Sequence, residues 1–156
     1  MNDSATAEGQ TSTKLFTIGF AGKSAEKFFE TLRSAGIRRL VDVRLNNVSQ
    51  LAGFAKKRDL EYFLRAIAGI EYVHDVELAP TKDILDGYKK KRVGWDEYER
   101  RFLELMGSRR PDERLQPTEL DHACLLCSEP TPERCHRRLV AEYLKSHWGN
   151  IEIQHL

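Results

Sequence analysis

Short apolar runs recur along the chain, and most of them are followed by a longer stretch in which apolar and polar residues alternate at helical spacing. Runs that are rich in branched and aromatic residues, and that are bounded by glycine or polar clusters, are typical of buried β-strands. The predicted strands are Lys14–Phe20, Ile37–Arg44, Ile70–His74, Ala123–Cys127 and the alternating segment Ile151–His155.

The first two stretches between these runs place apolar residues three and four positions apart, which predicts amphipathic helices. Ser24 is expected to cap the first helix, which ends before Gly36, and Asp59 is expected to cap the second, which ends at Gly69. The expected buried residues are Phe28, Phe29, Leu32, Leu60, Phe63, Leu64 and Ile67.

The middle of the chain is less regular, and two further helices are expected beyond it. Residues 75–94 contain a proline, a possible short helix near Asp83–Tyr88 and a basic run, which predicts a long exposed excursion. A helix is predicted over Trp95–Met106 and a loop over Arg109–Gln116. The last helix is expected to begin at the cap Thr131 and to run to about Trp148.

Strands that alternate with helices of a dozen residues predict an α/β fold, because parallel strands need crossover connections of that length. The expected architecture is a three-layer αβα domain with a mostly parallel sheet of about five strands. A chain of 156 residues suits one such domain. We expect residues 14–156 to form it, and residues 1–13, which are small and polar, to be a disordered tail.

Charge and apolar content limit the possible partners. Lys and Arg number 25 and Asp and Glu 24, for a net charge of +1, so any anion site must be local. No apolar run reaches the length of a membrane helix, and the first residues do not resemble a signal peptide. We therefore expect a cytoplasmic protein with no membrane partner, whose three clustered cysteines stay reduced.

The densest group of reactive side chains follows the fourth predicted strand. Ligands of parallel sheets bind beyond the carboxyl ends of the strands, where Cys127 and Glu129 are expected. Cys135, His136 and Arg137 fall in the first turns of the predicted last helix. A helix N-terminus favours anions and lowers the pKa of a nearby thiol, so the pattern indicates an anion pocket that contains thiols.

Other interpretations of this cluster stay open. Buried cysteines are usually small apolar residues, and a histidine at a helix start often only packs. A zinc site is the other rival, because Cys124, Cys127, Cys135 and His136 are four possible ligands. However, Cys124 and Cys127 are three positions apart in one strand, so their side chains should point to opposite faces. We therefore do not expect a four-ligand zinc site.

Two earlier segments also carry candidate chemistry. The segment Gly19–Ser24 has the context of a phosphate-binding loop, but its glycines are too close together, which favours an ordinary turn with a serine cap. Asp42 and Arg44 share one face of the second strand, either as a structural ion pair or as substrate ligands. The basic runs at residues 56–58, 89–92 and 109–110 would suit a phosphate backbone only if they line the same rim as the pocket.

These motifs together resemble the domain of unknown function 488 family over nearly the whole chain from about Leu15. The shared motifs are TIG at Thr17–Gly19, VDVR at Val41–Arg44, GIEY at Gly69–Tyr72 and LLCSEPTPERCHR at Leu125–Arg137. Phe20 stands where many relatives have a histidine, and the residues after VDVR and after the third strand also differ. The resemblance implies an α/β fold but no established reaction.

The leading hypothesis is an enzyme that acts on a phosphate-bearing small molecule or nucleic acid. Its candidate catalytic residues are Cys127, Cys135, His136 and Glu129, and its candidate substrate-binding residues are Asp42, Arg44 and Arg137. This hypothesis assigns no cofactor and no metal ligand. The alternatives are a module that binds nucleic acid or small anions without chemistry, and a metal-binding protein that uses His136, Cys135 and Asp42, or a structural zinc.

Overall fold

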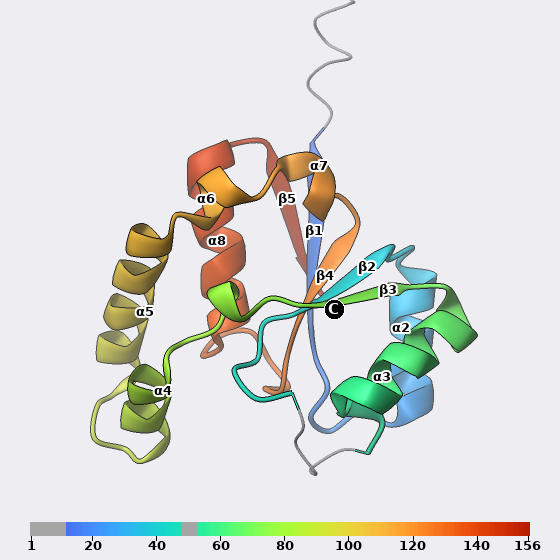
Figure 1. Cartoon of the computed structure of the whole chain (residues 1–156), viewed down its shortest axis with the longest axis horizontal. Coiled ribbons are helices and arrows are strands. Elements are labelled where there is room, and N and C mark those ends of the chain that lie inside the picture. Colours follow the sequence, from blue (N-terminus) through green and yellow to red (C-terminus); the bar gives the residue numbers. More distant parts are fainter. Residues whose placement is uncertain (1–11, 48–52) are drawn as a thin grey trace, which may run out of the picture.

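The computed structural model describes residues 12–47 and 53–156, and in these ranges five parallel strands form one sheet (Figure 1). The strands are β1 Thr13–Gly19, β2 Arg39–Asp42, β3 Glu71–His74, β4 Ala123–Cys127 and β5 Ile151–His155. Their spatial order is β3-β2-β4-β1-β5, and every neighbouring pair is parallel. The predicted α/β fold with a sheet of five strands is confirmed.

Helices cover both faces of the sheet, which gives the three expected layers (Figure 1). The helices are α2 Ala25–Ser34, α3 Lys57–Phe63, α4 Lys82–Lys89, α5 Trp95–Arg109, α6 Pro111–Arg114, α7 Pro117–Leu120 and α8 His136–Trp148. Short 3₁₀ turns lie at Gly53–Ala55 and Val76–Leu78, and a π turn at Leu64–Ala68 extends α3. In the view of Figure 1, α2 and α3 lie on one side of the sheet and α5 and α8 on the other.

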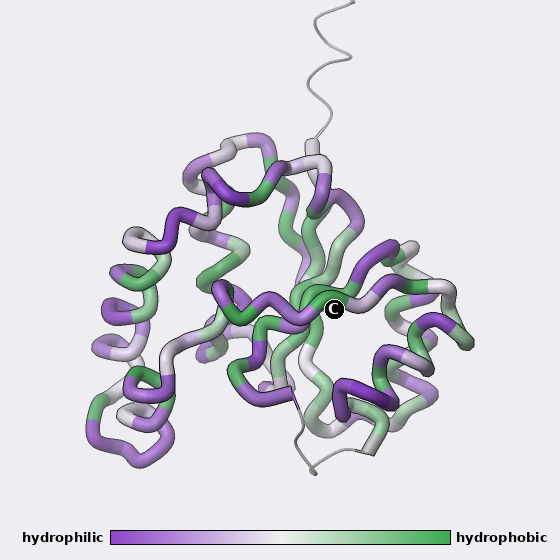
Figure 2. The backbone as a smooth tube through the Cα atoms, in the orientation of Figure 1, coloured by the Kyte–Doolittle hydropathy of each residue, from purple (hydrophilic) through white to green (hydrophobic). Residues whose placement is uncertain are grey.

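The central strand β4 divides its side chains between two separate apolar cores. Cys124 and Leu126 pack with α2 and α3, whereas Leu125 and Cys127 pack with α5 and α8. All five residues of β4 are buried, and the apolar centre of the sheet stands out in Figure 2. The predicted opposite orientation of Cys124 and Cys127 is therefore confirmed, and the sheet separates these two thiols.

The start of the last helix differs from the sequence-based expectation. Thr131 does not cap it; α8 begins at His136, and Cys135 is the N-cap residue with an extended backbone. Residues 128–135 instead form a loop whose carbonyl groups are bound by arginine side chains. Arg138 donates to the carbonyl oxygens of Pro132 at 3.2 Å and Glu133 at 2.8 Å. These side-chain bonds replace the backbone bonds that a longer helix would have made.

The segment that connects β2 to β3 also differs from the sequence-based expectation. Lys56, and not Asp59, is the N-cap residue of α3, and its side chain makes no capping bond. Leu60 and Leu64 are buried as expected, but Ile67 is 43% exposed. Ile67 lies in the π turn, whose wider winding shifts side chains away from the face that a regular α-helix would present.

The segments expected to be irregular contain more helix than the sequence suggested. In residues 75–94, α4 matches the short helix expected near Asp83–Tyr88 and a 3₁₀ turn precedes it, whereas α6 lies within the expected loop Arg109–Gln116. Most of the predicted tail 1–13 falls on residues 1–11, which lie outside the described residues. The part of the chain that the structure describes holds no helix with the length and apolar character needed to cross a bilayer.

Candidate functional site

The carboxyl ends of β1, β2 and β4 meet at one edge of the sheet, where a cavity of about 300 Å³ opens. The last residue of β4, the loop after it and the start of α8 supply Cys127, Glu129, Cys135 and His136 to its wall, and the segment after β2 supplies Arg44. The structure therefore brings together all four predicted catalytic residues and one predicted substrate ligand, because each follows a parallel strand or starts the next helix.

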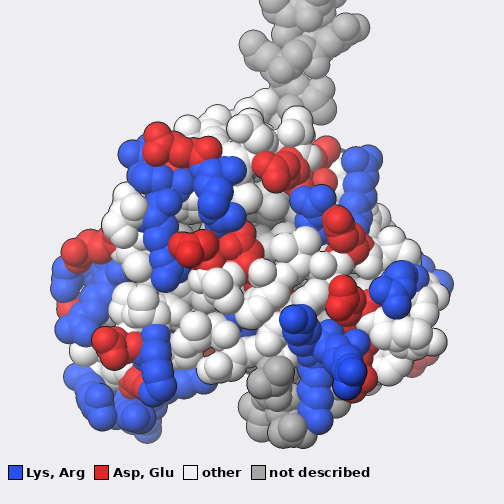
Figure 3. All heavy atoms as spheres, viewed as in Figure 1, with Lys and Arg blue, Asp and Glu red and all other residues white. Residues whose placement is uncertain are grey.

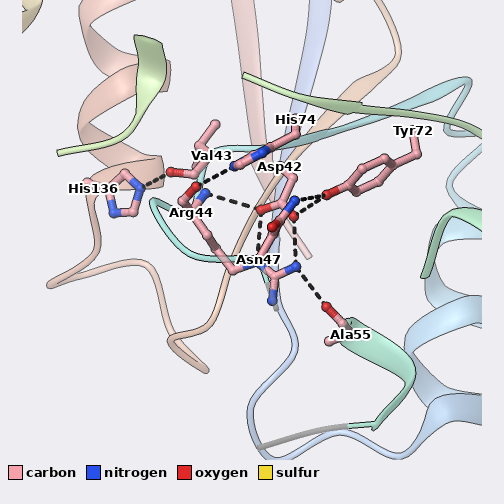
Figure 4. A network of polar contacts seen from close by, with 8 residues as sticks. All are labelled: Asp42, Val43, Arg44, Asn47, Ala55, Tyr72, His74 and His136. Atoms are coloured by element: carbon pink, nitrogen blue, oxygen red, sulfur yellow. Dashed lines mark hydrogen bonds and ion pairs between the residues drawn. The ribbon is translucent and has the colours of Figure 1, made fainter. Parts of the chain in front are cut away.

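Cys127 and His136 form a close pair in the buried part of this wall. Cys127 Sγ lies 3.6 Å from His136 Nδ1, and both side chains are almost fully buried. His136 Nε2 donates to the carbonyl oxygen of Val43 at 2.6 Å, since a carbonyl only accepts (Figure 4). That bond fixes the ring with Nδ1 toward the sulfur, so His136 can exchange a proton with Cys127.

This arrangement separates the pKa values of the thiols. The thiol of Cys135, whose sulfur lies within 4.8 Å of Cys127 Sγ, and the positive charge of His136 lower the pKa of Cys127 well below its ordinary value despite burial. The same contact with Cys127 raises the pKa of Cys135, and burial raises it further. Burial raises the pKa of Cys124. Cys127 is thus the thiol that the protein favours as a thiolate.

The electrostatics of His136 complement those of Cys127. Burial lowers the pKa of an imidazole, but here the negative sulfur of Cys127 and the hydrogen bond to Val43 outweigh it, so the pKa of His136 is raised. A thiol with a lowered pKa beside an imidazole with a raised pKa favours the thiolate–imidazolium form of the pair. This form is the reactive one in nucleophilic cysteine chemistry.

Arg137 lies behind the cysteines and is wholly buried, outside the lining of the cavity. Its Nη1 donates to the carbonyl oxygen of Glu129 at 2.8 Å and to Cys135 Sγ at 3.3 Å, and its Nε donates to Thr17 Oγ1 at 3.3 Å. Among the described residues no carboxylate pairs with it, and its Nη2 has no protein partner. Arg137 therefore holds the loop after β4 and adds positive charge near the thiols.

Asp42 and Arg44 form a bidentate ion pair at the end of β2 (Figure 4). Arg44 Nε and Nη2 donate to the two carboxylate oxygens of Asp42 at 2.8 and 2.7 Å, and Tyr72 donates to the same carboxylate at 2.6 Å. Arg44 also donates to the carbonyl oxygen of Ala55 at 2.8 Å, and its guanidinium lies 5.2 Å from the centre of the Phe20 ring. The structural ion pair is present, whereas the substrate role of both residues stays a prediction.

The loop between β1 and α2 is shaped by contact with residues 128–135, the loop between β4 and α8, which we call the cysteine loop. Phe20 and Ala21 donate backbone hydrogen bonds to the carbonyl oxygens of Cys127 and Ser128 at 3.2 and 3.0 Å. A Cβ built on Gly19 would lie 1.6 Å from the carbonyl oxygen of Glu129, so this position needs glycine. Lys23 folds back onto the loop and donates to the carbonyl oxygen of Gly19 at 2.7 Å. The glycine of the TIG motif thus serves close backbone packing.

Aromatic residues that sequence reasoning did not single out complete the wall of the cavity. Tyr88 from α4 and Tyr98 from α5 line it, and their ring centres are 4.9 Å apart. Tyr98 belongs to the apolar stripe of α5, so its burial was predictable, but its place beside the cysteines depends on how α5 packs across the sheet. Val43 was missed because it acts through its backbone carbonyl, which no side-chain pattern reveals.

The mouth of the cavity carries exposed charges. Lys89 and Arg134 are basic lining residues, and the exposed Glu129 is an acidic one. Figure 3 shows Lys and Arg side chains gathered over α4 and the turn that follows it. Of the three basic runs, residues 89–92 thus contribute to the rim, while Arg109 binds backbone carbonyl groups of residues 76–79 instead.

Three side chains of the site also lie close enough together to be candidate ligands of one metal ion. One ligand atom each of Cys127, Cys135 and His136 lies within 4.8 Å of the others. Cys124 is on the far side of the sheet, and Asp42 is held by Arg44 and Tyr72, so neither joins this group. The expected ligand set of His136, Cys135 and Asp42 is therefore not assembled in the described residues.

Comparison with known proteins identifies one family. The family model described as "Domain of unknown function DUF488" matches residues 24–144. This span contains the VDVR and GIEY segments and the whole of the cysteine loop. No curated protein and no solved structure matches the chain.

Proposed function

The chain belongs to the family of the domain of unknown function DUF488, and from this premise we propose that it is an enzyme whose nucleophile is Cys127. Its substrate is a phosphate-bearing molecule that enters the cavity at the carboxyl edge of the sheet. The single observation that carries the proposal is the separation of 3.6 Å between Cys127 Sγ and His136 Nδ1 in the wall of that cavity.

In this proposal Cys127 is the nucleophile, and His136 donates and accepts the protons that nucleophilic catalysis requires. Cys127 Sγ attacks phosphorus, the bond from phosphorus to the leaving oxygen breaks, and His136 gives that oxygen the proton held on Nδ1. Water then attacks the phosphorus, the phosphorus–sulfur bond breaks, and the proton of the water returns to His136. The bond from His136 to Val43 keeps the ring in place through both steps.

The other predicted catalytic residues take supporting roles in this proposal. The thiol of Cys135 lies within 4.8 Å of Cys127 Sγ and keeps its own proton, because its pKa is raised. Cys135 is therefore a positioning residue and not the nucleophile. Glu129 is exposed at the mouth, where its carboxylate meets incoming substrate or solvent rather than the buried imidazole.

The lining of the cavity supports a phosphate-bearing substrate. Lys89 and Arg134 place two positive charges at the mouth, and such charges attract phosphate groups. The rings of Tyr88 and Tyr98 offer apolar faces beside them, and aromatic faces of this kind stack on nucleobases. A nucleotide or the end of a nucleic acid combines both features.

The proposal is tested by turnover of a panel of phosphate monoesters, phosphodiesters, nucleotides and short oligonucleotides. The expected result is release of product from at least one class, which Cys127→Ser abolishes and Cys124→Ala retains. Both variants would first be checked for an unchanged circular dichroism spectrum. Salt-dependent binding of the oligonucleotides that survives Cys127→Ser, with no turnover of any compound, would instead identify a binding module.

A further inference from the structure

The positions of Cys127, His136 and Cys135 suit a metal ion, which the nucleophilic mechanism does not use. Zinc binds thiolate sulfur at about 2.3 Å and imidazole nitrogen at about 2.1 Å, so two such ligands at a tetrahedral angle are about 3.6 Å apart. Cys127 Sγ and His136 Nδ1 are 3.6 Å apart. Cys135 Sγ lies within 4.8 Å of both atoms, so a small inward movement brings it to coordination distance.

The hydrogen bonds made by His136 and Cys135 match those that residues binding a metal ion usually make. A histidine ligand usually donates its other ring N–H to a carbonyl or carboxylate, which fixes the ring. His136 does so through Nε2, which donates to Val43 at 2.6 Å. Arg137 Nη1 donates to Cys135 Sγ at 3.3 Å, and this contact stabilises a deprotonated thiol.

The cavity leaves a fourth coordination position accessible. All three ligand residues line it, and Cys124 and Asp42, which sequence reasoning offered as further ligands, lie elsewhere. Three protein ligands beside an open cavity are the pattern of zinc sites that exchange water or a small ligand, whereas structural sites are closed by four protein ligands.

We propose that Cys127 Sγ, Cys135 Sγ and His136 Nδ1 bind one soft divalent cation such as zinc, with the fourth position open to the cavity. Binding to the thiolate–imidazolium form releases two protons, one from the thiol of Cys135 and one from His136 Nδ1. The metal then occupies the electron pair with which Cys127 would attack a substrate. The inference goes beyond the proposed function, because it makes the metal-bound and nucleophilic states of the site mutually exclusive.

Cobalt(II) is the probe for this site, since it replaces zinc and its bonds to thiolates absorb light. The full chain, freed of metal with a chelator and kept reduced, is titrated with cobalt(II) and then with zinc. The expected result is one equivalent of cobalt per chain with a thiolate-to-metal charge-transfer band, and displacement of that band by zinc.

Variants connect the signal to the three ligands. Cys135→Ser should lower the affinity by more than about 100-fold, because loss of even an outer-shell partner costs metal sites about 10–100-fold. Cys124→Ala is the matched control, since it removes a buried thiol on the other side of the sheet, and it should bind cobalt like the parent chain. Circular dichroism of each variant separates loss of a ligand from loss of the fold.

Two results would overturn the proposal. One is the absence of stoichiometric cobalt or zinc binding by the reduced parent chain, and the other is binding that Cys135→Ser leaves unchanged. Neither result affects the proposed function, which is tested in the metal-free chain by turnover. Conversely, a chain that binds one zinc but turns over no substrate supports the metal site and contradicts only the enzyme.

Discussion

A Cβ atom on Gly19 would lie 1.6 Å from the carbonyl oxygen of Glu129. This close approach joins the end of β1 to the loop that follows Cys127. Arg137 Nη1 donates to the same carbonyl oxygen at 2.8 Å and lies 3.0 Å from that Cβ position. The position of the cysteine loop thus depends on a residue with no side chain, located more than a hundred positions earlier in the chain.

Gly19→Ala should therefore destabilise the fold and displace the loop that carries Glu129. Overpacking of this kind costs roughly 1–3 kcal/mol in the free energy of unfolding, measured by urea denaturation. Gly107→Ala in α5 is the control, because in the described structure no atom beyond its chain neighbours and its own helix backbone lies within 4 Å of its Cβ position, and it should be neutral or stabilising by about 0.5–1 kcal/mol. Equal stability of the Gly19→Ala variant and the parent chain would contradict the packing described.

The buried ion pair between Asp42 and Arg44 should be essential to stability. Its two side chains are 0% and 5% exposed, so Asp42→Asn leaves the guanidinium of Arg44 buried without its counter-charge. The expected loss is about 3–5 kcal/mol in the free energy of unfolding. Glu71→Gln breaks the neighbouring exposed pair with Arg39 and should cost less than about 1 kcal/mol. Similar losses of unfolding free energy for both variants would show that the burial of the Asp42–Arg44 pair does not determine its contribution to stability.

His136→Gln should make Cys127 less reactive at neutral pH. The substitution removes the cation that helps to lower the pKa of Cys127, so that pKa rises and less thiolate is present at pH 7. Each unit of pKa changes the thiolate fraction about tenfold, so alkylation of Cys127 should slow by about tenfold or more. His74→Gln is the matched control, since His74 also binds a backbone carbonyl, that of Arg44 at 2.8 Å, but it lies on β3, which β2 separates from the strand that carries Cys127. A similar decrease in both variants would exclude a specific role of His136.

The two cations at the mouth should determine how well phosphate protects Cys127 from alkylation. Lys89→Gln and Arg134→Gln each remove one charge from the lining of the cavity. Each should weaken protection by inorganic phosphate about threefold at low salt, as expected for a charge about 6 Å away in water. Lys145→Gln, near the far end of α8, should have no effect. Unchanged protection in both mouth variants would show that phosphate does not bind here.

Local sequence patterns were sufficient to predict the sheet and the cysteine cluster. Strand parity placed Cys124 and Cys127 on opposite faces, and the alternation of strands and helices predicted the edge at which Cys127 and His136 meet. These features are determined by periodicities of two and 3.6 residues, which a single sequence displays.

Features that depend on tertiary contacts were not predictable in this way. The cap signal at Thr131 did not start α8, because the side chains of Arg137 and Arg138 bind the carbonyl groups of that segment. The carbonyl of Val43, which orients His136, belongs to the backbone and leaves no trace in the residue type. The enclosure of the site by Tyr88 arises from the packing of α4, which was expected to lie in an exposed excursion.

The most direct test of the central claim is the pH dependence of thiol alkylation in the native, metal-free chain, followed for each cysteine by mass spectrometry. An ordinary thiol becomes reactive near its pKa of about 8.5. We expect Cys127 to react well below that pH, because its pKa is lowered, whereas Cys124 and Cys135 should react only after unfolding. If Cys127 is as inert as Cys124 until the chain unfolds, it is a core residue and the proposed nucleophile does not exist.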